Sequence, residues 1–282
     1  MSALFASARR LALLALLMCY AAPALAPKAQ AGPWPTLSGK YFFILEYYRY
    51  QTSQGTLSDG TRYAFPNGGQ YTNNAFKIYG EYGLAPGWVL EGSTVFFDQD
   101  FREGVRTRGS YGFSDLEVAL NHHFLEDPLQ MSARVGVSVP WLYGTDREPR
   151  LGFNQYSLIL GLNAGDEIPF VLPMWWAADV NYRFYFGEAS DQLGYEGTLG
   201  VHLGERLDVM GQVFGTHNMQ DGTFQSVFNP LIQSGITLMK WSVSGVFKFN
   251  ENFALRLAYF EDFYSENAGF GDTWSLSAWV EF

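Results

Sequence analysis

Four histidines are the first side chains to consider for catalysis: His122, His123, His202 and His217. A hydrolase needs a nucleophile beside a base, and a third group must orient that base. Asp208 lies across a tight predicted turn from His202 and could orient it, but no serine sits one or two residues away on either strand. Metal binding is equally unsupported, because no two histidines share a strand face at ligand spacing. We therefore expect no enzyme, no catalytic residues, no metal site and no cofactor.

Charged side chains alternate with apolar ones along much of the chain, which favours a polar lumen over an active site. Acids and bases are interspersed among the candidates for lining this lumen and setting its selectivity. These candidates are Lys77, Glu81, Glu91, Asp115, Glu117, Arg134, Asp179, Arg183, Glu196 and Arg256. Two interpretations stay open: the charges fill and rigidify the interior, or the same charges form a selectivity filter. Glu81 and Glu91 face each other without a matching cation, so they are the best candidates for selecting cations.

Hairpin geometry predicts that some of these charges form pairs. Glu117 and Arg134 are equally far from the turn between them, and Arg183 and Glu196 face each other across a predicted loop. Cross-strand pairs of opposite charge stabilise a sheet by roughly 0.2–1 kcal/mol each. The members of such pairs would also neutralise each other inside the lumen.

A long late loop, residues 218–232, is apolar for a connection between strands. Its apolar side chains include Phe224, Val227 and Phe228. We expect this loop to fold inward as a constriction or gate. Deleting residues 224–228 should then raise the conductance of the lumen, and an unchanged conductance would contradict the gate.

Strands must position all of these residues, because the apolar positions repeat with a period of two. Residues 131–139 alternate aliphatic with small or polar side chains, and residues 195–203 do the same. This period indicates strands with one apolar and one polar face. Twelve such strands are predicted, at residues 40–52, 71–84, 88–99, 111–124, 129–143, 153–163, 170–186, 192–204, 206–217, 235–249, 252–264 and 272–282.

The predicted connections alternate between short turns and longer polar or Gly-rich loops. Aromatic residues gather near both ends of the predicted strands, for example Trp141 and Tyr259 at one end and Trp88 and Phe124 at the other. An even strand number, short turns on one side, longer loops on the other and two aromatic girdles are typical of outer-membrane barrels. The apolar face would point to lipid, and closure would leave no unpaired strand edge.

Residues 1–31 are predicted to be a cleaved signal peptide. Arg9 and Arg10 precede an apolar stretch and a small-residue cleavage site, which is the order of a secretory signal. A retained membrane anchor is the alternative, but the stretch falls short of the ~20 residues that span a bilayer. Cys19 is the only cysteine, so residues 32–282 would form a barrel without disulfides.

The overall composition excludes several classes of protein. Only 16% of the residues are charged and 17% are aromatic, which is not the composition of a disordered chain. The formal net charge is −10, so the basic footprint of a nucleic-acid binder is missing.

Several short segments resemble the outer-membrane barrels named for the meta-pathway of phenol degradation. They are residues 79–84 with Trp88, 111–117, 179–183, 197–201 and 279–282. The resemblance extends from about Ala75 to the end of the chain and implies uptake of small, aromatic molecules. The alternating residues up to Phe282 also resemble the terminal strand by which bacterial barrels are recognised for assembly.

The sequence therefore predicts an all-β fold, a transmembrane antiparallel up-and-down barrel of about twelve strands in the bacterial outer membrane. We expect a channel or passive uptake protein for a small hydrophobic or aromatic solute. A structural or interaction barrel with an occluded lumen is the alternative, followed by an outer-membrane lipid hydrolase. The expected partners are outer-membrane lipid and lipopolysaccharide, the barrel assembly machinery through Phe282, and the solute, but no nucleic acid.

Overall fold

The structure, a computed structural model, describes residues 34–144, 148–170, 172–219 and 228–282. The predicted signal peptide therefore lies outside the described residues. The strands of the main sheet are β1 (Tyr41–Thr52), β4 (Gln70–Ala85), β5 (Trp88–Glu103), β6 (Arg106–Phe113), β7 (Leu116–Leu125), β8 (Gln130–Val139), β9 (Ser157–Ile168), β10 (Met174–Tyr185), β11 (Gln192–His202), β12 (Leu207–Asn218), β13 (Thr237–Asn250), β14 (Phe253–Glu266) and β15 (Asp272–Glu281). A small separate sheet pairs β2 (Gln54–Thr56) with β3 (Arg62–Ala64), and a 3-10 turn, η1 (Pro66–Gly68), follows it.

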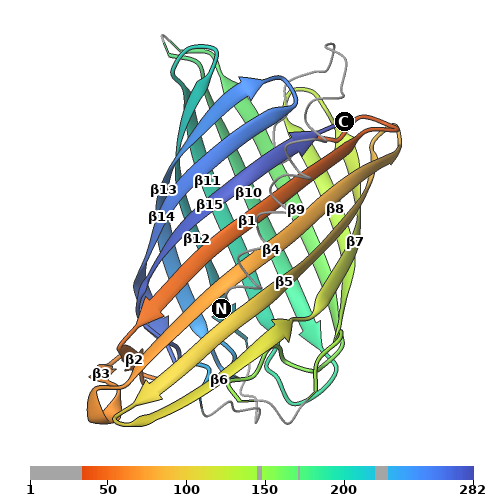
Figure 1. Cartoon of the computed structure of the whole chain (residues 1–282). Helices are drawn as coiled ribbons and strands as arrows, with labels where there is room; N and C mark the ends of the chain where they lie inside the picture. The colour runs from red at the N-terminus through yellow and green to blue at the C-terminus, as the bar shows by residue number, and fades with distance from the viewer. Residues whose placement is uncertain (1–33, 145–147, 171, 220–227) are drawn as a thin grey trace, which may run out of the picture.

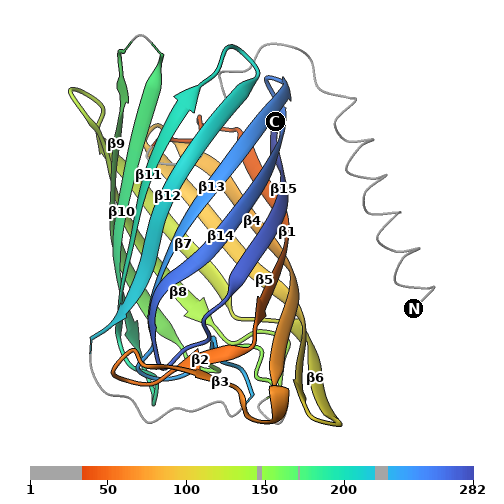
Figure 2. The same cartoon turned by 90° about the vertical axis from the view of Figure 1, so that its left-hand side faces the viewer.

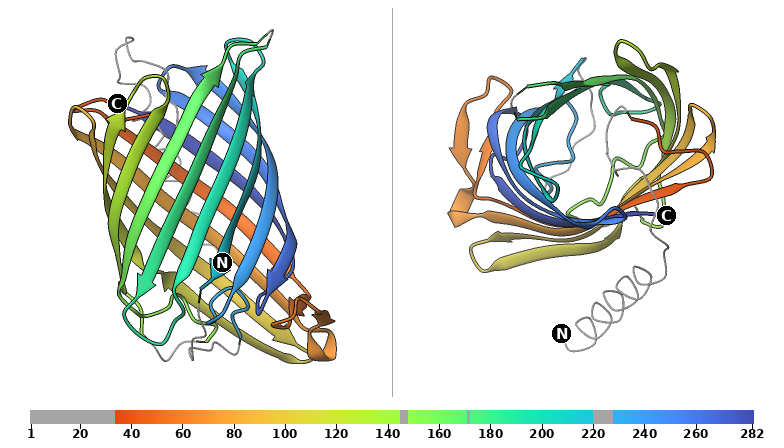
Figure 3. Two further views of the ribbon diagram at one scale, coloured as in Figure 1. Left: turned by 180° about the vertical axis from the view of Figure 1, so that it is seen from behind. Right: turned by 90° about the horizontal axis from the view of Figure 1, so that it is seen from above.

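The main sheet closes on itself, because β1 pairs antiparallel with β4 on one side and with β15 on the other. β6 and β7 follow each other along one side of β5, so the 13 strands occupy twelve positions in a closed ring. Figures 1 and 2 show the tilted strands of this barrel, and the axial view in Figure 3 shows the ring. The predicted twelve-stranded antiparallel barrel is confirmed.

The two ends of the barrel differ in the length of their connections. Short turns join the strands at one end, here called the turn end, which lies at the top of Figure 1. The longer connections, whose described parts include residues 140–144, 148–156 and 228–236, lie at the opposite loop end. β5 and β6 pair beyond the rest of the wall at the loop end and form a projection that we call the tongue. Its tip is the turn at Gly104 and Val105.

The outside of the barrel is apolar along its middle. Alternate residues of β1 point outward, among them Tyr41, Leu45 and Tyr47 at 44%, 43% and 37% exposure. Leu160 and Leu162 of β9 are exposed in the same way. A continuous band of exposed apolar side chains is favourable against lipid and unfavourable in water, so the exterior has the character of a membrane-embedded surface. Within the described ranges, no helix is long and apolar enough to cross a bilayer.

Several of the predicted strands end at different residues than their periodicity indicates. The predicted run 153–163 is shifted, because β9 spans Ser157–Ile168 and includes residues 164–167, which were predicted to be a turn. The predicted run 111–124 is broken at Ser114 and Asp115, where the chain leaves β6 and starts β7. The predicted run 129–143 ends at Val139, because Pro140 has no backbone N–H to donate to a neighbouring strand. Both interruptions lie towards the loop end, where the wall gives way to inward-folded loops.

Candidate functional site

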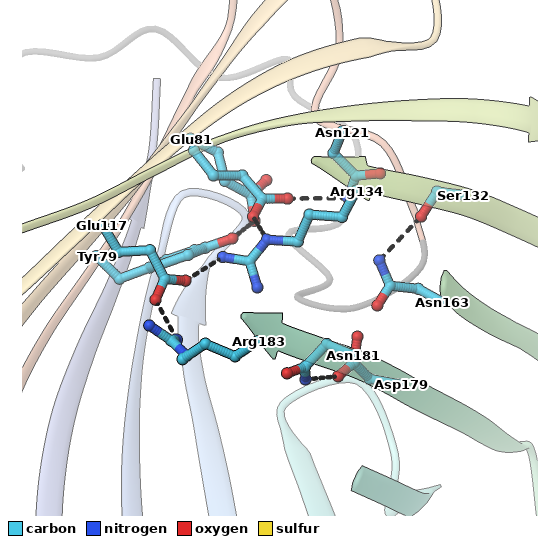
Figure 4. A network of polar contacts seen from close by, with 11 residues as sticks. Tyr79, Glu81, Glu117, Asn121, Ser132, Arg134, Asn163, Asp179, Asn181 and Arg183 are labelled. Atoms are coloured by element: carbon cyan, nitrogen blue, oxygen red, sulfur yellow. Dashed lines mark hydrogen bonds and ion pairs between the residues drawn. The ribbon is translucent and has the colours of Figure 1, made fainter. Parts of the chain in front are cut away.

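A network of ion pairs lies on the inner wall of the barrel (Figure 4). Glu117 on β7 accepts from Arg134 on β8 and from Arg183 on β10, with N–O distances of 2.6 Å each. Arg134 also reaches Glu91 on β5 at 2.9 Å. The four residues come from alternate, inward positions of their strands, so the period of two places them in the lumen. Together they form a connected charged network across adjacent parts of the wall.

The predicted pairs are partly correct. Glu117 and Arg134 do pair, although Glu117 lies opposite Ser138 in the sheet and the long arginine side chain spans the offset. The predicted pair of Arg183 and Glu196 is wrong, because the register places Arg183 opposite Gln192. Arg183 instead reaches across β9 and β8 to Glu117, a contact that no hairpin could predict.

Glu81 and Glu91 lie directly opposite each other on β4 and β5, as predicted. The expectation that this pair lacks a cation is wrong, because Arg134 binds Glu91, which also accepts from the Asn121 amide at 2.9 Å. Glu81 accepts hydrogen bonds from the hydroxyl groups of Tyr79, at 2.6 Å, and of Thr36. Uncharged hydroxyl groups therefore donate hydrogen bonds to the Glu81 carboxylate, while an arginine neutralises the charge of Glu91.

Beyond the network, towards the loop end, the lumen holds a cavity of about 530 Å³, which we call the chamber. Glu117 and Arg183 of the network contribute to its wall. Four further charged candidates, Lys77, Asp115, Asp179 and Glu196, also line the chamber. Aromatic side chains alternate with these charges on the wall, namely Phe97, Phe153, Tyr185, Tyr195 and Phe214.

Asp179 and Glu196 are opposite each other on β10 and β11, both facing the chamber. Each accepts from an uncharged neighbour, Asp179 from the Asn181 amide at 2.8 Å and Glu196 from the Gln212 amide at 2.7 Å. Arg256, another candidate, donates to Gln212 from β14. In the described chain, more lumen-facing acids than bases lack an ion pair within 4 Å: Glu46, Glu81, Asp115, Asp179, Glu196 and Glu281 against Lys77 and Arg256.

Two loops fold over the loop end of the lumen and are tied to the tongue through Gln99. The Gln99 amide, 1% exposed, donates to the backbone carbonyls of Pro149 and Arg150 at 3.0 and 2.8 Å. Asn229, from the other loop, donates to Gln99 Oε1 at 3.0 Å and to the Arg150 carbonyl at 2.7 Å. Ser110 of β6 adds a hydrogen bond to the Pro149 carbonyl. Buried amides thus hold the two loops to each other and to the wall.

Asp115, beside the chamber, holds one of these two inward-folded loops, residues 148–156. It accepts hydrogen bonds from the Tyr143 hydroxyl and from the backbone N–H of Phe153, the latter at 3.2 Å. Burial and the nearby carboxylate raise the pKa of Tyr143, so this phenol stays protonated and donates. Gly152 is required here, because a Cβ would overlap the Tyr143 hydroxyl.

Of the predicted gate, Phe224 and Val227 lie outside the described residues. Phe228 packs its ring against Phe101 of β5 at 5.7 Å and lies under the Arg108 guanidinium at 4.1 Å. The described part of this loop therefore folds inward onto the tongue. Whether the loop gates the lumen stays a prediction.

The histidines are occupied by other interactions. His202 binds Asp208 at 2.7 Å, as predicted, and Lys248 binds the same carboxylate at 2.6 Å, so this dyad belongs to an ion cluster near the turn end. The ring of His122 stacks on Trp88 at 4.1 Å on the outer face. Over the described ranges, no group of three or more His, Cys, Asp or Glu could hold a metal ion.

Sequence reasoning missed the neutral residues that organise the site. Gln99 and Asn229 are uncharged, and their importance depends on contacts between segments that are 130 residues apart. The only signal for Gln99 was a polar side chain at an inward position of β5 among Val95, Phe97 and Phe101.

Comparison with known proteins supports the fold alone. No protein-family model matches the sequence, and no curated protein matches it. An outer membrane channel from Pseudomonas putida F1 is similar in structure, with a TM-score of 0.70 and 13% identity over 92% of this chain and 100% of that one. The NanC porin has a TM-score of 0.52 and 6% identity over 84% of this chain and 98% of that one.

Proposed function

We propose that this chain is a bacterial outer-membrane channel through which a small solute passes passively, without covalent chemistry. The observation that carries this proposal is a closed barrel with an apolar exterior around a polar chamber of about 530 Å³. The turn end would face the periplasm and the loop end the outside, as short turns and long loops do in bacterial barrels. The similar structures, one described as an outer membrane channel and the other as a porin, support the same function.

The solute proposed is a small hydrophobic or aromatic molecule. The chamber presents aromatic rings from several strands, including Phe97, Tyr195 and Phe214, next to its charges. Such rings favour offset-stacked or edge-to-face contact with another ring. The motif resemblance to the meta-pathway phenol-degradation barrels supports the same class of solute.

Single-channel recording of the purified full chain in a planar bilayer tests the channel. We expect discrete conductance steps and, in a salt gradient, a reversal potential that shows cation preference, because unpaired acids outnumber unpaired bases in the lumen. The double variant Asp179→Asn, Glu196→Gln should shift the reversal potential towards anions. The matched control Asp127→Asn, Glu126→Gln removes the same charges from an exposed turn and should leave it unchanged. A folded, heat-modifiable barrel that conducts in no form would contradict the proposal.

An occluded structural or interaction barrel is a second candidate, favoured by the ion network and the inward-folded loops. It predicts no conductance and no solute-induced swelling of proteoliposomes.

The remaining roles complete the proposal. Residues 1–31 would direct export, and Phe282 would be recognised by the barrel assembly machinery. Phe282 lies at the turn end, where its backbone pairs with Tyr41, and this position supports the proposed role. The tongue and the other loops would face lipopolysaccharide.

A further inference from the structure

The first described residues run through the turn end of the lumen. Residues 34–38, which we call the strap, precede β1 and leave the wall at a turn in which the Lys40 N–H donates to the Leu37 carbonyl at 2.9 Å. In the axial view of Figure 3 this segment, coloured red, bends from the rim into the ring of strands.

The strap reaches the opposite side of the barrel. The Trp34 ring packs edge-on against Trp175 of β10, with their centroids 5.6 Å apart. Between β1 and β10 the ring of strands holds β4, β5, β7, β8 and β9 on one side and β15, β14, β13, β12 and β11 on the other. Trp175 is therefore diametrically opposite the point where the strap begins, and the strap spans the full width of the lumen.

Trp34 enters an apolar patch of the inner wall. Its neighbours Trp175, Met210, Val246 and Ala254 are 8%, 4%, 2% and 7% exposed. The patch draws on β10, β12, β13 and β14, and Trp34 packs against it together with Ala177 and Trp279. An apolar patch inside a lumen is unfavourable in water, and burying it under Trp34 holds the strap in place.

Two contacts fix the other end of the strap to β4. The Thr36 hydroxyl donates to Glu81, and Ser38 forms an isolated bridge with Gly83. Gly83 must lack a side chain, because a Cβ there would overlap the backbone of Leu37. Gly39, at φ +80°, joins the strap to β1 through a backbone conformation that other residues rarely adopt.

We propose that the strap closes the turn end of the lumen, and that passage requires Trp34 to leave the patch around Trp175. The strap is separate from the ladder of the barrel: its backbone is held at the Ser38 bridge and at the turn after Leu37, and side-chain contacts hold the rest. It can therefore be withdrawn without breaking the wall. This inference rests on the proposed channel function, and the strap itself can be tested independently of it.

Conductance gives the first test. Trp34→Ala removes the ring that reaches the opposite wall, and Gly83→Ala displaces the strap from β4 without changing Trp34. We expect both variants to conduct severalfold more than the unchanged chain. Trp141→Ala and Gly211→Ala are the matched controls, because Trp141 is exposed at the outer rim and a Cβ at Gly211 meets no atom within 4 Å. Variant channels with the conductance of the unchanged chain would overturn the proposal.

Thiol labelling measures whether Trp34 covers the patch, and it does so whether or not the barrel conducts. In a Cys19→Ser background of the full chain, Met210→Cys places one thiol in the buried patch that Trp34 packs against. A water-soluble maleimide should label it at least tenfold faster when Trp34→Ala is added, whereas Thr107→Cys on the exposed tongue should label equally fast in both forms. Equal labelling of Met210→Cys with and without Trp34 would overturn the strap. A third outcome separates the two proposals. If Met210→Cys is labelled fast only when Trp34 is absent, and no variant conducts, the strap closes the lumen but the proposed channel function is contradicted.

Discussion

At the scale of single residues, one carboxylate in the lumen forms ion pairs with two arginines. Glu117 binds Arg134 with one oxygen and Arg183 with the other. The side chains of all three are less than a quarter exposed, so water replaces these contacts only in part. Removing one partner from a largely buried ion pair leaves a charge that is costly to desolvate.

Glu117→Gln should destabilise the barrel, because it leaves two arginines with one neutral partner. The expected loss is on the order of 3 kcal/mol in the free energy of unfolding. Urea denaturation of the refolded barrel, followed by the heat-modifiable shift on a gel, measures this loss. Glu205→Gln, in an exposed turn, is the control. Equal midpoints for the two variants would show that the network adds no stability.

The sequence predicted which residues face the lumen but not all of their partners. Alternation along a strand assigns a face to each position, and the structure places all ten predicted candidates on the inner side. Which residues form an ion pair depends on the register of the strands and on the length of the side chains. Arg183 does not pair with Glu196 on the neighbouring strand and instead binds Glu117, three strands away in the wall. The selectivity roles of these residues stay predictions.

At the scale of elements, tight packing between neighbouring strands shapes the turn end of the lumen. Trp175 of β10 lies opposite Gly200 of β11, and its indole lies over the backbone there. A glycine leaves room for a large ring to lie against the neighbouring strand. This position of Trp175 is what presents its face to Trp34.

Gly200→Ala should destabilise the barrel, because the new Cβ would overlap the Trp175 ring, which is buried in a cluster with Met210 and is in contact with Trp34. Overpacking of this kind costs about 1–3 kcal/mol. The thermal midpoint of the heat-modifiable transition measures the loss. Gly211→Ala, with open space around its Cβ, should keep the midpoint of the unchanged chain.

Strand periodicity predicted the elements well and their ends less well. The predicted strand at 192–204 corresponds to β11 (Gln192–His202), and the one at 88–99 to the first part of β5. The tongue was not predicted, because its outer part alternates polar residues such as Asp98, Asp100 and Arg102 that resemble a loop. The strap was missed because its contacts join residue 34 to residue 175 and leave no local pattern.

At the scale of the whole molecule, the last strand closes the ring. β15 pairs with β1 along ten residues, and the backbone N–H of Phe282 donates to the Tyr41 carbonyl at 2.9 Å. Closure by the terminal strand means that the barrel has no complete wall until the end of the chain is in place.

Deletion of Phe282 should therefore lower the fraction of chain that reaches the outer membrane in folded form. We expect a severalfold loss, because the two backbone hydrogen bonds between Phe282 and Tyr41 and the proposed recognition residue are both removed. Outer-membrane fractionation with the heat-modifiable shift measures this fraction. Phe170→Ala, which removes an aromatic ring from an exposed turn, is the control. Equal folded fractions would contradict a role for Phe282 in assembly.

The tongue extends past the ends of the neighbouring strands at the loop end of the barrel. Its tip residue Val105 is fully exposed, at 103% of the reference area, and Gly104 beside it already adopts the left-handed conformation of a tight turn. Residues 106–109 behind the tip are exposed as well, and of these Arg108 contacts the inward-folded loop at Phe228. In the proposed orientation, with the loop end outside, a peptide inserted between Gly104 and Val105 would be displayed on the surface of intact cells. An antibody could bind it there, and the tongue would then serve for labelling and capturing this barrel in living bacteria.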